Sequence, residues 1–222
     1  MSELQAVVFD IDGTLIDSND AHARAWVDAF REVEIAVDLE QVRAVGGLGP
    51  RELIRKVGGL PDDDARVVQL MKRRSEIFRA VYLPTLQPFP RATDLLARMH
   101  GRGVHVAVVT SASADELGDL LEVGGIRALV EARATSSDVE HGAPEPDVIA
   151  AALAKLDVLD RTRALMIGDT PEDVAAAQRA GIEAIAFRCG GRRDDELQGA
   201  VAIYDGPADL FDHYDASIFA RA

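Results

Sequence analysis

Cysteine is almost absent from this chain of 222 residues, which contains only Cys189. A single cysteine cannot form a disulfide within the chain, and such usage is typical of a reducing compartment. The sequence also lacks an apolar run near the roughly 18 residues of a membrane helix, and no basic, apolar leader follows Met1. We therefore expect a cytoplasmic protein with no membrane partner, in which Cys189 is a buried or incidental thiol.

Basic residues are outnumbered as well. The chain has 24 Lys and Arg against 38 Asp and Glu, a formal net charge of −14. Because nucleic-acid binding depends on neutralising phosphates with basic side chains, this balance disfavours a nucleic-acid partner. The simplest interpretation of the acidic surface is solubility. The hydrophobic fraction, 48 %, is ample for a packed core.

Four short apolar runs predict strands, at residues 6–9, 105–109, 164–167 and 184–187. Segments with a helical pattern follow or separate them, at residues 92–100, 115–123, 148–156 and 171–180. Near-continuous apolar strands that alternate with helices predict an α/β fold, a doubly wound parallel sheet covered on both faces. Ligands of such sheets bind beyond the carboxyl ends of the strands.

One long stretch after the first run breaks this alternation. Residues 20–33 and 63–81 have helical patterns, and two glycine-rich segments lie between them. Prolines then punctuate the return to the next helix. We predict a small helical cap domain at residues 17–87, mounted on a Rossmann-like core made of residues 1–16 and 88–222.

The first apolar run ends in Asp10, which opens the segment Asp10-Ile11-Asp12-Gly13-Thr14. Paired carboxylates at a strand end suit metal binding, or a nucleophile beside a general acid/base. An ordinary Asp-Gly turn would account for the same residues. Thr110-Ser111, at the end of the second run, can bind phosphate through hydroxyls and backbone N–H groups, although a helix N-cap is the simpler interpretation in isolation.

The third run ends in Asp169, and Asp173 follows four residues later. A helix that starts with Thr170 as its N-cap explains Asp173, but it does not explain an aspartate at the end of an apolar strand. A Mg²⁺ site built from carboxylates and a substrate phosphate explains both acids.

Together, these three segments resemble the motifs of the haloacid dehalogenase superfamily, in order and in spacing. The resemblance covers nearly the whole chain, including the insert, which looks like the small helical cap of the phosphoglycolate phosphatase and β-phosphoglucomutase type. It implies that Asp10 is the nucleophile and Asp12 the general acid/base. It further implies that Thr110 and Ser111 bind the transferred phosphoryl group. The implied Mg²⁺ site comprises Asp10, the Ile11 backbone carbonyl, Asp12, Asp169 and Asp173.

The insert carries three further residues of interest. His22 and Trp26 resemble the His-x-x-x-Trp pattern of members that act on sugar phosphates and phosphoglycolate. A core role is favoured for Trp26, whereas His22 is a candidate substrate contact. Arg51, beside a glycine-rich loop, can bind a second anionic group of the substrate or simply be solvated.

One position departs from the family pattern. Members of this type carry a lysine in a Gly-Lys-Pro-x-Pro-Asp segment, and here Ala143 stands at that place between Gly142 and Pro144. Either another cation substitutes, or activity is weak, or the lysine was removed by evolution or by an experimenter. His141 is the nearest spare cation, and Arg133 or a residue of the cap is another option.

The resemblance thus implies a Mg²⁺-dependent phosphatase that hydrolyses a small phosphorylated metabolite through an aspartyl-phosphate, as a monomer or weak homodimer. A sugar-phosphate mutase uses the same nucleophile and acid/base and is an alternative. A non-catalytic binding protein on this scaffold is a third reading, suggested only by Ala143. Dehalogenation is disfavoured, because dehalogenating relatives lack the second acid that Asp12 provides.

Overall fold

The computed structural model describes residues 4–135, 138, 145–158 and 160–221. The chain divides into two compact units. Residues 1–17 and 87–222 form one, the sheet unit, and residues 18–86 form the other, the helical unit. Each boundary of the helical unit falls one residue inside the predicted segment 17–87.

The sheet unit is built on six parallel strands in the order β3-β2-β1-β4-β5-β6. Their bounds are β1 Ala6–Asp10, β2 His105–Thr110, β3 Ala132–Thr135, β4 Ala164–Gly168, β5 Glu183–Phe187 and β6 Ala202–Tyr204. In the centre, Val8 of β1 is in register with Ala107 of β2 and Met166 of β4. The chain first winds outward through β2 and β3 and then returns to β4, so the winding direction reverses beside β1. Ligand sites of open α/β sheets form at such a reversal.

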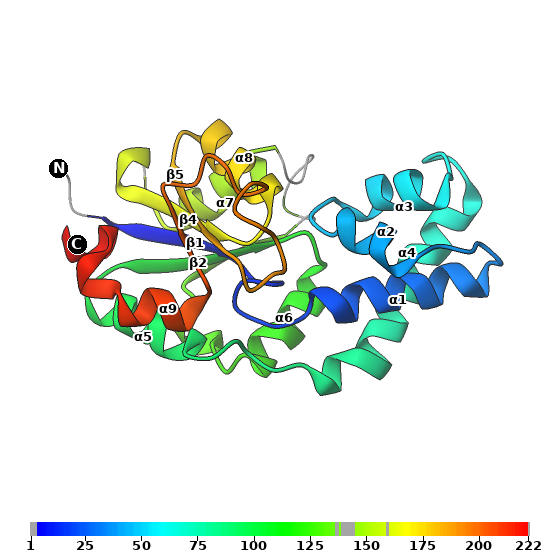
Figure 1. Ribbon diagram of the computed structural model, residues 1–222, viewed down its shortest axis with the longest axis horizontal. Helices are drawn as coiled ribbons and strands as arrows, with labels where there is room; N and C mark the ends of the chain where they lie inside the picture. The colour runs from blue at the N-terminus through cyan, green and yellow to red at the C-terminus, as the bar shows by residue number, and fades with distance from the viewer. Residues whose placement is uncertain (1–3, 136–137, 139–144, 159, 222) are drawn as a thin grey trace. The chain divides into compact units, whose positions relative to one another are not determined.

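Helices cover both faces of this sheet (Figure 1). One face carries α7 (Asp147–Lys155) and α8 (Pro171–Ala180), and the other carries α5 (Ala92–Gly101), α6 (Ala114–Val123) and α9 (Pro207–Asp212). The residues packed under α7 and α8 are mostly small: Ala6, Val8, Ala107, Val109, Ala132, Ala134, Ala164, Met166, Ala184 and Ala186. The opposite face of β1 presents Val7 and Phe9, which are fully buried too. Burial on both faces explains why the strands read as continuous apolar runs.

The α/β doubly wound architecture and its four predicted strands are confirmed. Two edge strands, β3 and β6, have no counterpart among the predicted runs. They are only four and three residues long, β3 is interrupted by Arg133, and every residue of β6 is half-exposed. Edge strands of this kind lack the continuous apolar signal of buried ones.

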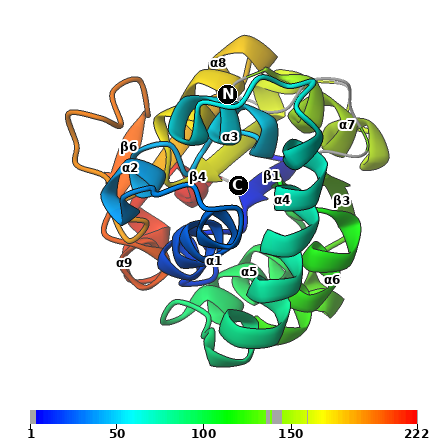
Figure 2. The same ribbon diagram turned by 90° about the vertical axis from the view of Figure 1, so that its right-hand side faces the viewer.

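The helical unit contains α1 (Asn19–Glu32), α2 (Leu39–Ala44), α3 (Pro50–Gly58) and α4 (Ala65–Ile77), the last continuing as a π-helical turn over Phe78–Tyr82 (Figure 2). Residues 18–86 include no strand. Trp26, Phe30 and Phe78 form its aromatic core, each at most 5 % exposed. Gly58 lets α3 approach α1, since a Cβ there would lie 2.5 Å from the Phe30 ring. Among the described residues of both units, no helix is long and apolar enough to cross a membrane.

Candidate active site

The loop after β1 folds back on itself directly beyond Asp10. Gly13 has a φ of 77°, in the left-handed region that favours glycine. Its N–H donates to the Ile16 carbonyl at 2.9 Å, and the Leu15 N–H donates to the Ile11 carbonyl at 3.0 Å. This tight turn follows Asp10 directly, and Asp12 at its start is near enough for its charge to raise the pKa of Asp10.

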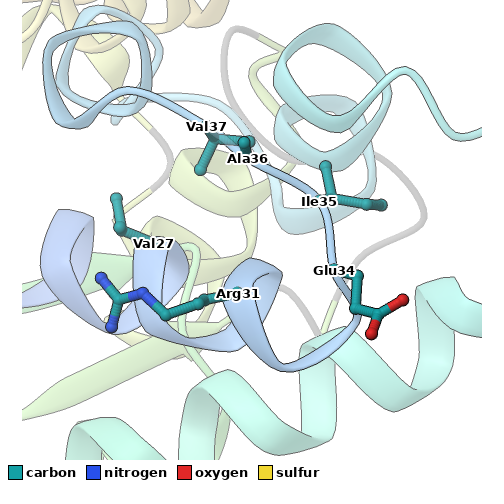
Figure 3. A pocket seen from close by; sticks show the side chains of 6 residues that line it. All are labelled: Val27, Arg31, Glu34, Ile35, Ala36 and Val37. Atoms are coloured by element: carbon teal, nitrogen blue, oxygen red, sulfur yellow. The ribbon is translucent and has the colours of Figure 1, made fainter.

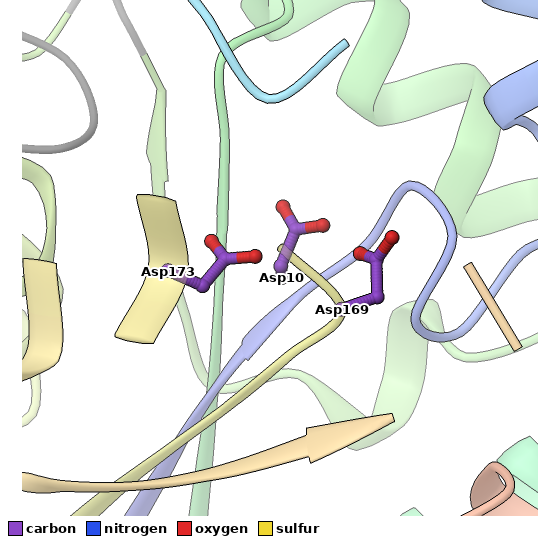
Figure 4. Close-up of side chains that lie close together, drawn as sticks. All are labelled: Asp10, Asp169 and Asp173. Atoms are coloured by element: carbon purple, nitrogen blue, oxygen red, sulfur yellow. The ribbon is translucent and has the colours of Figure 1, made fainter. Parts of the chain in front are cut away.

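Three carboxylates converge at this edge (Figure 4). Asp10 ends β1, Asp169 directly follows β4, and Asp173 lies in the first turn of α8. One carboxylate oxygen of each lies within 4.8 Å of the other two. Asp169 is fully buried and Asp173 is 8 % exposed. The parallel pairing of β1 with β4 creates this acidic cluster, because it ends both strands side by side.

Uncharged neighbours fix Asp169 in place. The Thr14 hydroxyl donates to Asp169 Oδ1 at 2.9 Å, and both side chains are fully buried. Gly190, in the loop after β5, lies so close that a Cβ there would be 1.7 Å from Asp169 Oδ2. The preceding Cys189 thiol donates to the Gly13 carbonyl at 3.3 Å. Burial, and then the charge of Asp169, raises the pKa of Cys189 to about 12.

Asp173 is held by its own helix. It forms a capping box with Thr170, the N-cap of α8: the Thr170 hydroxyl donates to Asp173 Oδ2 at 2.6 Å and accepts from the Asp173 N–H at 3.2 Å. Both interpretations of this segment therefore apply at once, because Asp173 caps the helix and also belongs to the acidic cluster.

The electrostatics of the cluster favour a cation. Burial, and then the charges of the neighbouring aspartates, raise the pKa of Asp10 well above its usual range. Burial raises the pKa of Asp173 to about 6, against the hydrogen bonds from Thr170 that lower it. Oxygen ligands at about 2.0–2.1 Å from one Mg²⁺ lie up to about 4.2 Å apart, so small side-chain movements would bring these oxygens onto one ion. The residues present therefore fit a hard divalent cation.

A hydrogen bond joins Thr110 to Asp12, which is not part of the acidic cluster. Thr110 is the last residue of β2 and is 5 % exposed. Its hydroxyl donates to Asp12 Oδ2 at 3.2 Å. Ser111 is exposed. The N-cap of α6 is Ser113, whose hydroxyl accepts from the Glu116 N–H at 3.3 Å. Thr110 and Ser111 therefore lie before the cap, and capping does not account for them.

The remaining candidate residues belong to other elements. His22 is in α1, where its ring stacks on Phe78 with centroids 4.1 Å apart and pairs with Arg74. Arg51 is in α3, exposed, and donates to the Asp62 carbonyl at 3.2 Å. Arg133 is in β3, and its guanidinium reaches the Arg127 carbonyl at 3.5 Å. Ala143 and His141 lie outside the described residues.

Figure 3 shows an open pocket of the helical unit. It is lined by Val27, Arg31, Glu34, Ile35, Ala36 and Val37. Arg31 is already paired with Asp28 at 2.7 Å. The lining of this pocket therefore offers no arrangement of reactive groups comparable to the acidic cluster.

Sequence reasoning did not single out Cys189 and Gly190 as neighbours of the site. A signal for them existed, because both follow the fourth apolar run and therefore lie at the same edge of the sheet as the acids.

Comparison with known proteins agrees with this geometry. The family of haloacid dehalogenase-like hydrolases matches residues 7–187, so the chain belongs to that family. A probable phosphatase, IndB, of Dickeya dadantii (strain 3937) is 30 % identical over 197 residues, covering 87 % of this chain and 85 % of that protein. A phosphoglycolate phosphatase of Rhodospirillum rubrum is 30 % identical over 220 residues, covering 94 % of this chain and 90 % of that protein.

Solved structures give the same fold. A hydrolase from Pseudomonas syringae superposes with a TM-score of 0.88 at 24 % identity, covering 96 % of this chain and 98 % of that one. Proteins described as β-phosphoglucomutases are also among the matches. By family and by relatives, the chain is a phosphatase of this family, a phosphoric monoester hydrolase.

Proposed function

We propose that the chain hydrolyses a small phosphorylated metabolite through an aspartyl-phosphate formed on Asp10. Asp12 is the general acid/base, and the acidic cluster, with the Ile11 carbonyl, holds Mg²⁺. The observation that carries this proposal is the convergence of Asp10, Asp169 and Asp173 at the end of β1, with Asp12 two residues away.

The chemistry divides into two transfers. A carboxylate oxygen of Asp10 attacks phosphorus while the bond from phosphorus to the leaving oxygen breaks, and Asp12 gives its proton to that oxygen. Water then attacks phosphorus and gives a proton to Asp12, while the bond from phosphorus to the Asp10 oxygen breaks. This step releases inorganic phosphate and restores both acids. Bound Mg²⁺ supplies neutralisation of the charge that otherwise accumulates between the carboxylates and the phosphoryl oxygens.

We assign substrate selection to the helical unit, acting as a cap. Supporting this, the relatives include a phosphoglycolate phosphatase, and the unit carries an exposed arginine, Arg51. Arg51 is suited to a second anionic group, since a guanidinium binds carboxylate and phosphate through two parallel hydrogen bonds. The substrate class is then a small phosphate monoester with another polar or anionic end.

A phosphate-release screen over phosphorylated metabolites, with and without Mg²⁺, tests the proposal. We expect turnover that excess chelator abolishes and added Mg²⁺ restores. Asp10→Asn should remove both turnover and the trapped phosphoenzyme, because an amide cannot form the acyl phosphate. Full activity in chelator, or a phosphoenzyme in the asparagine variant, would overturn it.

A sugar-phosphate mutase is the second candidate, favoured by the similarity to β-phosphoglucomutases. A mutase returns the phosphoryl group from aspartate to the sugar and protects it from water. Turnover of a sugar monophosphate that depends on a catalytic amount of its bisphosphate, with little phosphate released, would identify that activity.

A further inference from the structure

The turn after β5 lies against the acidic cluster. The Gly191 N–H donates to the Arg188 carbonyl at 2.8 Å, which closes a tight turn over residues 188–191. Gly191 has a φ of 96°, in the left-handed region that favours glycine. Within this turn lies Gly190, where a Cβ would be 1.7 Å from Asp169 Oδ2. The position of the turn therefore decides how much room the Asp169 carboxylate has.

The side chain of Arg188, the first residue of this turn, is bound on two sides. Its guanidinium donates from Nε and Nη2 to the two oxygens of Asp194, at 2.6 and 2.9 Å, and from Nη1 to Asp205 Oδ1 at 2.7 Å. Asp194 belongs to the loop between β5 and β6, whereas Asp205 directly follows β6. The Arg188 N–H also donates to the Tyr204 carbonyl, at 3.0 Å. One arginine thus joins the turn, the loop and the end of the neighbouring strand.

Ion pairs of this kind can hold a loop in place. Single exposed pairs contribute little, but a bidentate arginine–carboxylate pair within a network of charges is the exception. The Arg188 side chain is 37 % exposed, and hydrogen bonds to Asp194, and then to Asp205, raise the pKa of its guanidinium. The Cys189 thiol connects the same turn to the Gly13 carbonyl, at 3.3 Å. Because a thiol is a weak donor, we expect the ion pairs to restrain the turn more strongly.

We propose that Arg188 is a positioning residue for the metal site. By joining the loop after β5 to the end of β6, it holds the turn so that Gly190 keeps the Asp169 carboxylate in the orientation that binds the ion. This rests on the Mg²⁺ site under Proposed function. Loss of a group that touches a metal ligand commonly costs 10- to 100-fold in affinity, and Arg188 acts one contact further away, so a smaller effect is expected.

Electron paramagnetic resonance of free Mn²⁺ measures this effect without substrate or turnover, because Mn²⁺ favours the same oxygen ligands as Mg²⁺. For Arg188→Gln, we expect the dissociation constant of Mn²⁺ to rise by about three- to tenfold. Charge alone predicts the opposite sign, since removing a positive charge strengthens the attraction for a cation. Arg188→Lys keeps the charge without the bidentate pair, and its dissociation constant should lie between those of Arg188→Gln and the wild type. The kcat at saturating Mg²⁺ should stay at the wild-type value, because only the affinity for the ion changes.

Arg193→Gln is the matched control. Arg193 lies in the same loop and makes a bidentate pair with Asp195, at 2.9 and 3.0 Å, but its ion pairs, with Asp195 and Glu196, stay within the loop. Its side chain is 74 % exposed. This variant loses the same charge and should bind Mn²⁺ at least as tightly as the wild type. Binding that is unchanged in Arg188→Gln, or weakened equally in Arg193→Gln, would overturn the positioning role.

Asp169→Asn separates this role from the metal site itself. If the wild type binds no Mn²⁺, or if Asp169→Asn binds it as tightly as the wild type, the acidic cluster does not hold the ion and the positioning role fails with it. If Asp169→Asn loses the ion and Arg188→Gln keeps wild-type affinity, only the positioning role is overturned. Should Arg188→Gln not fold, Arg188→Lys carries the comparison, and a wild-type dissociation constant in that variant overturns the role.

Discussion

At the scale of single residues, the acidic cluster is shaped by side chains that carry no charge. Thr14 supplies a hydrogen bond to one oxygen of Asp169, and Gly190 supplies nothing but space beside the other. Groups around metal ligands commonly set the orientation of those ligands. The absence of a side chain at position 190 is therefore part of the site.

Gly190→Ala should disrupt the site. Its Cβ would lie 1.7 Å from Asp169 Oδ2, so either the loop after β5 or the Asp169 carboxylate must move. We expect the Mg²⁺ concentration needed for half-maximal activity to rise by about 10- to 100-fold, the usual cost of disturbing groups around a metal ligand. Titration of phosphatase activity with Mg²⁺ measures this change.

Gly101→Ala is the matched control. A Cβ at Gly101, the last residue of α5, would meet nothing within 4 Å. Its Mg²⁺ dependence should equal that of the wild type, and its stability should be unchanged or slightly higher, because alanine favours helix more than glycine does. An unaltered Mg²⁺ requirement in Gly190→Ala would show that the loop accommodates the methyl group.

A substitution at position 143 should raise activity instead of lowering it. The family resemblance implies that a lysine at this position neutralises the proposed nucleophile and the phosphoryl oxygens, through charge-assisted hydrogen bonds worth about 1.5–3 kcal/mol each. If one such bond forms mainly in the transition state, Ala143→Lys should raise kcat/KM at least about tenfold without changing the preferred substrate. Steady-state kinetics on both forms measures this. No gain would mean that another cation already fills the role, and His141→Ala would then be compared in both backgrounds.

At the scale of elements, α8 connects stability to the site. Thr170 caps this helix and orients Asp173 through the same hydroxyl. Thr170→Ala should lower the free energy of unfolding by about 1 kcal/mol, the typical cost of losing an N-cap. It should also raise the Mg²⁺ requirement, because Asp173 Oδ2 loses the shorter of the two hydrogen bonds that Thr170 donates to it. Urea unfolding and Mg²⁺ titration measure the two effects separately.

Asp38 provides the comparison for Thr170. It forms a second capping box, with Gln41, at the start of α2 in the helical unit. Asp38→Ala should cost a similar free energy of unfolding and leave the Mg²⁺ requirement alone. A Thr170→Ala variant that loses stability but keeps its Mg²⁺ requirement would show that Asp173 needs no help from the cap.

Elements also differ in how far the sequence predicts them. Strands β1, β2, β4 and β5 are buried on both faces, so their apolar runs are continuous and their positions follow from composition. Helices α2 and α3 were not predicted, because they are short and glycine-rich segments adjoin them. Edge strands β3 and β6 lack a continuous apolar run for the reasons of length and exposure given above.

The contacts of the site also differ in how far the sequence predicts them. The meeting of Asp10 and Asp169 follows from strand order, since a parallel sheet brings strand ends to one edge. The hydrogen bond from Thr110 to Asp12 and the close approach of Gly190 to Asp169 do not follow from strand order. They depend on how the end of β2 packs on Asp12, 98 residues earlier in the chain, and on how the loop after β5 packs on Asp169, which no local pattern encodes.

At the scale of the whole molecule, negative charge is the dominant electrostatic feature. The formal net charge is −14, and three carboxylates meet in one cluster, of which Asp169 is fully buried. Self-repulsion of this kind destabilises a compact state, whereas an ion that binds only the folded state stabilises it. Stability of the sheet unit should therefore depend on a divalent cation.

Mg²⁺ should raise the melting temperature of the wild-type protein. At an ion concentration 100 times the dissociation constant, binding adds about 2.7 kcal/mol to the free energy of unfolding, which corresponds to about 5–11 °C for a chain of this size.

Asp10→Asn should be at least as stable as the wild type in chelator, because burial and neighbouring charge disfavour an ionised Asp10, as its raised pKa indicates. The same variant should gain little from Mg²⁺. Asp63→Asn removes an equal charge from an exposed position and should keep the full response to the ion. Thermal unfolding of the three proteins, with chelator and with Mg²⁺, measures these differences. A wild-type melting temperature that does not respond to Mg²⁺, in a protein that is active, would mean that the ion arrives with the substrate and that the acidic cluster alone does not hold it.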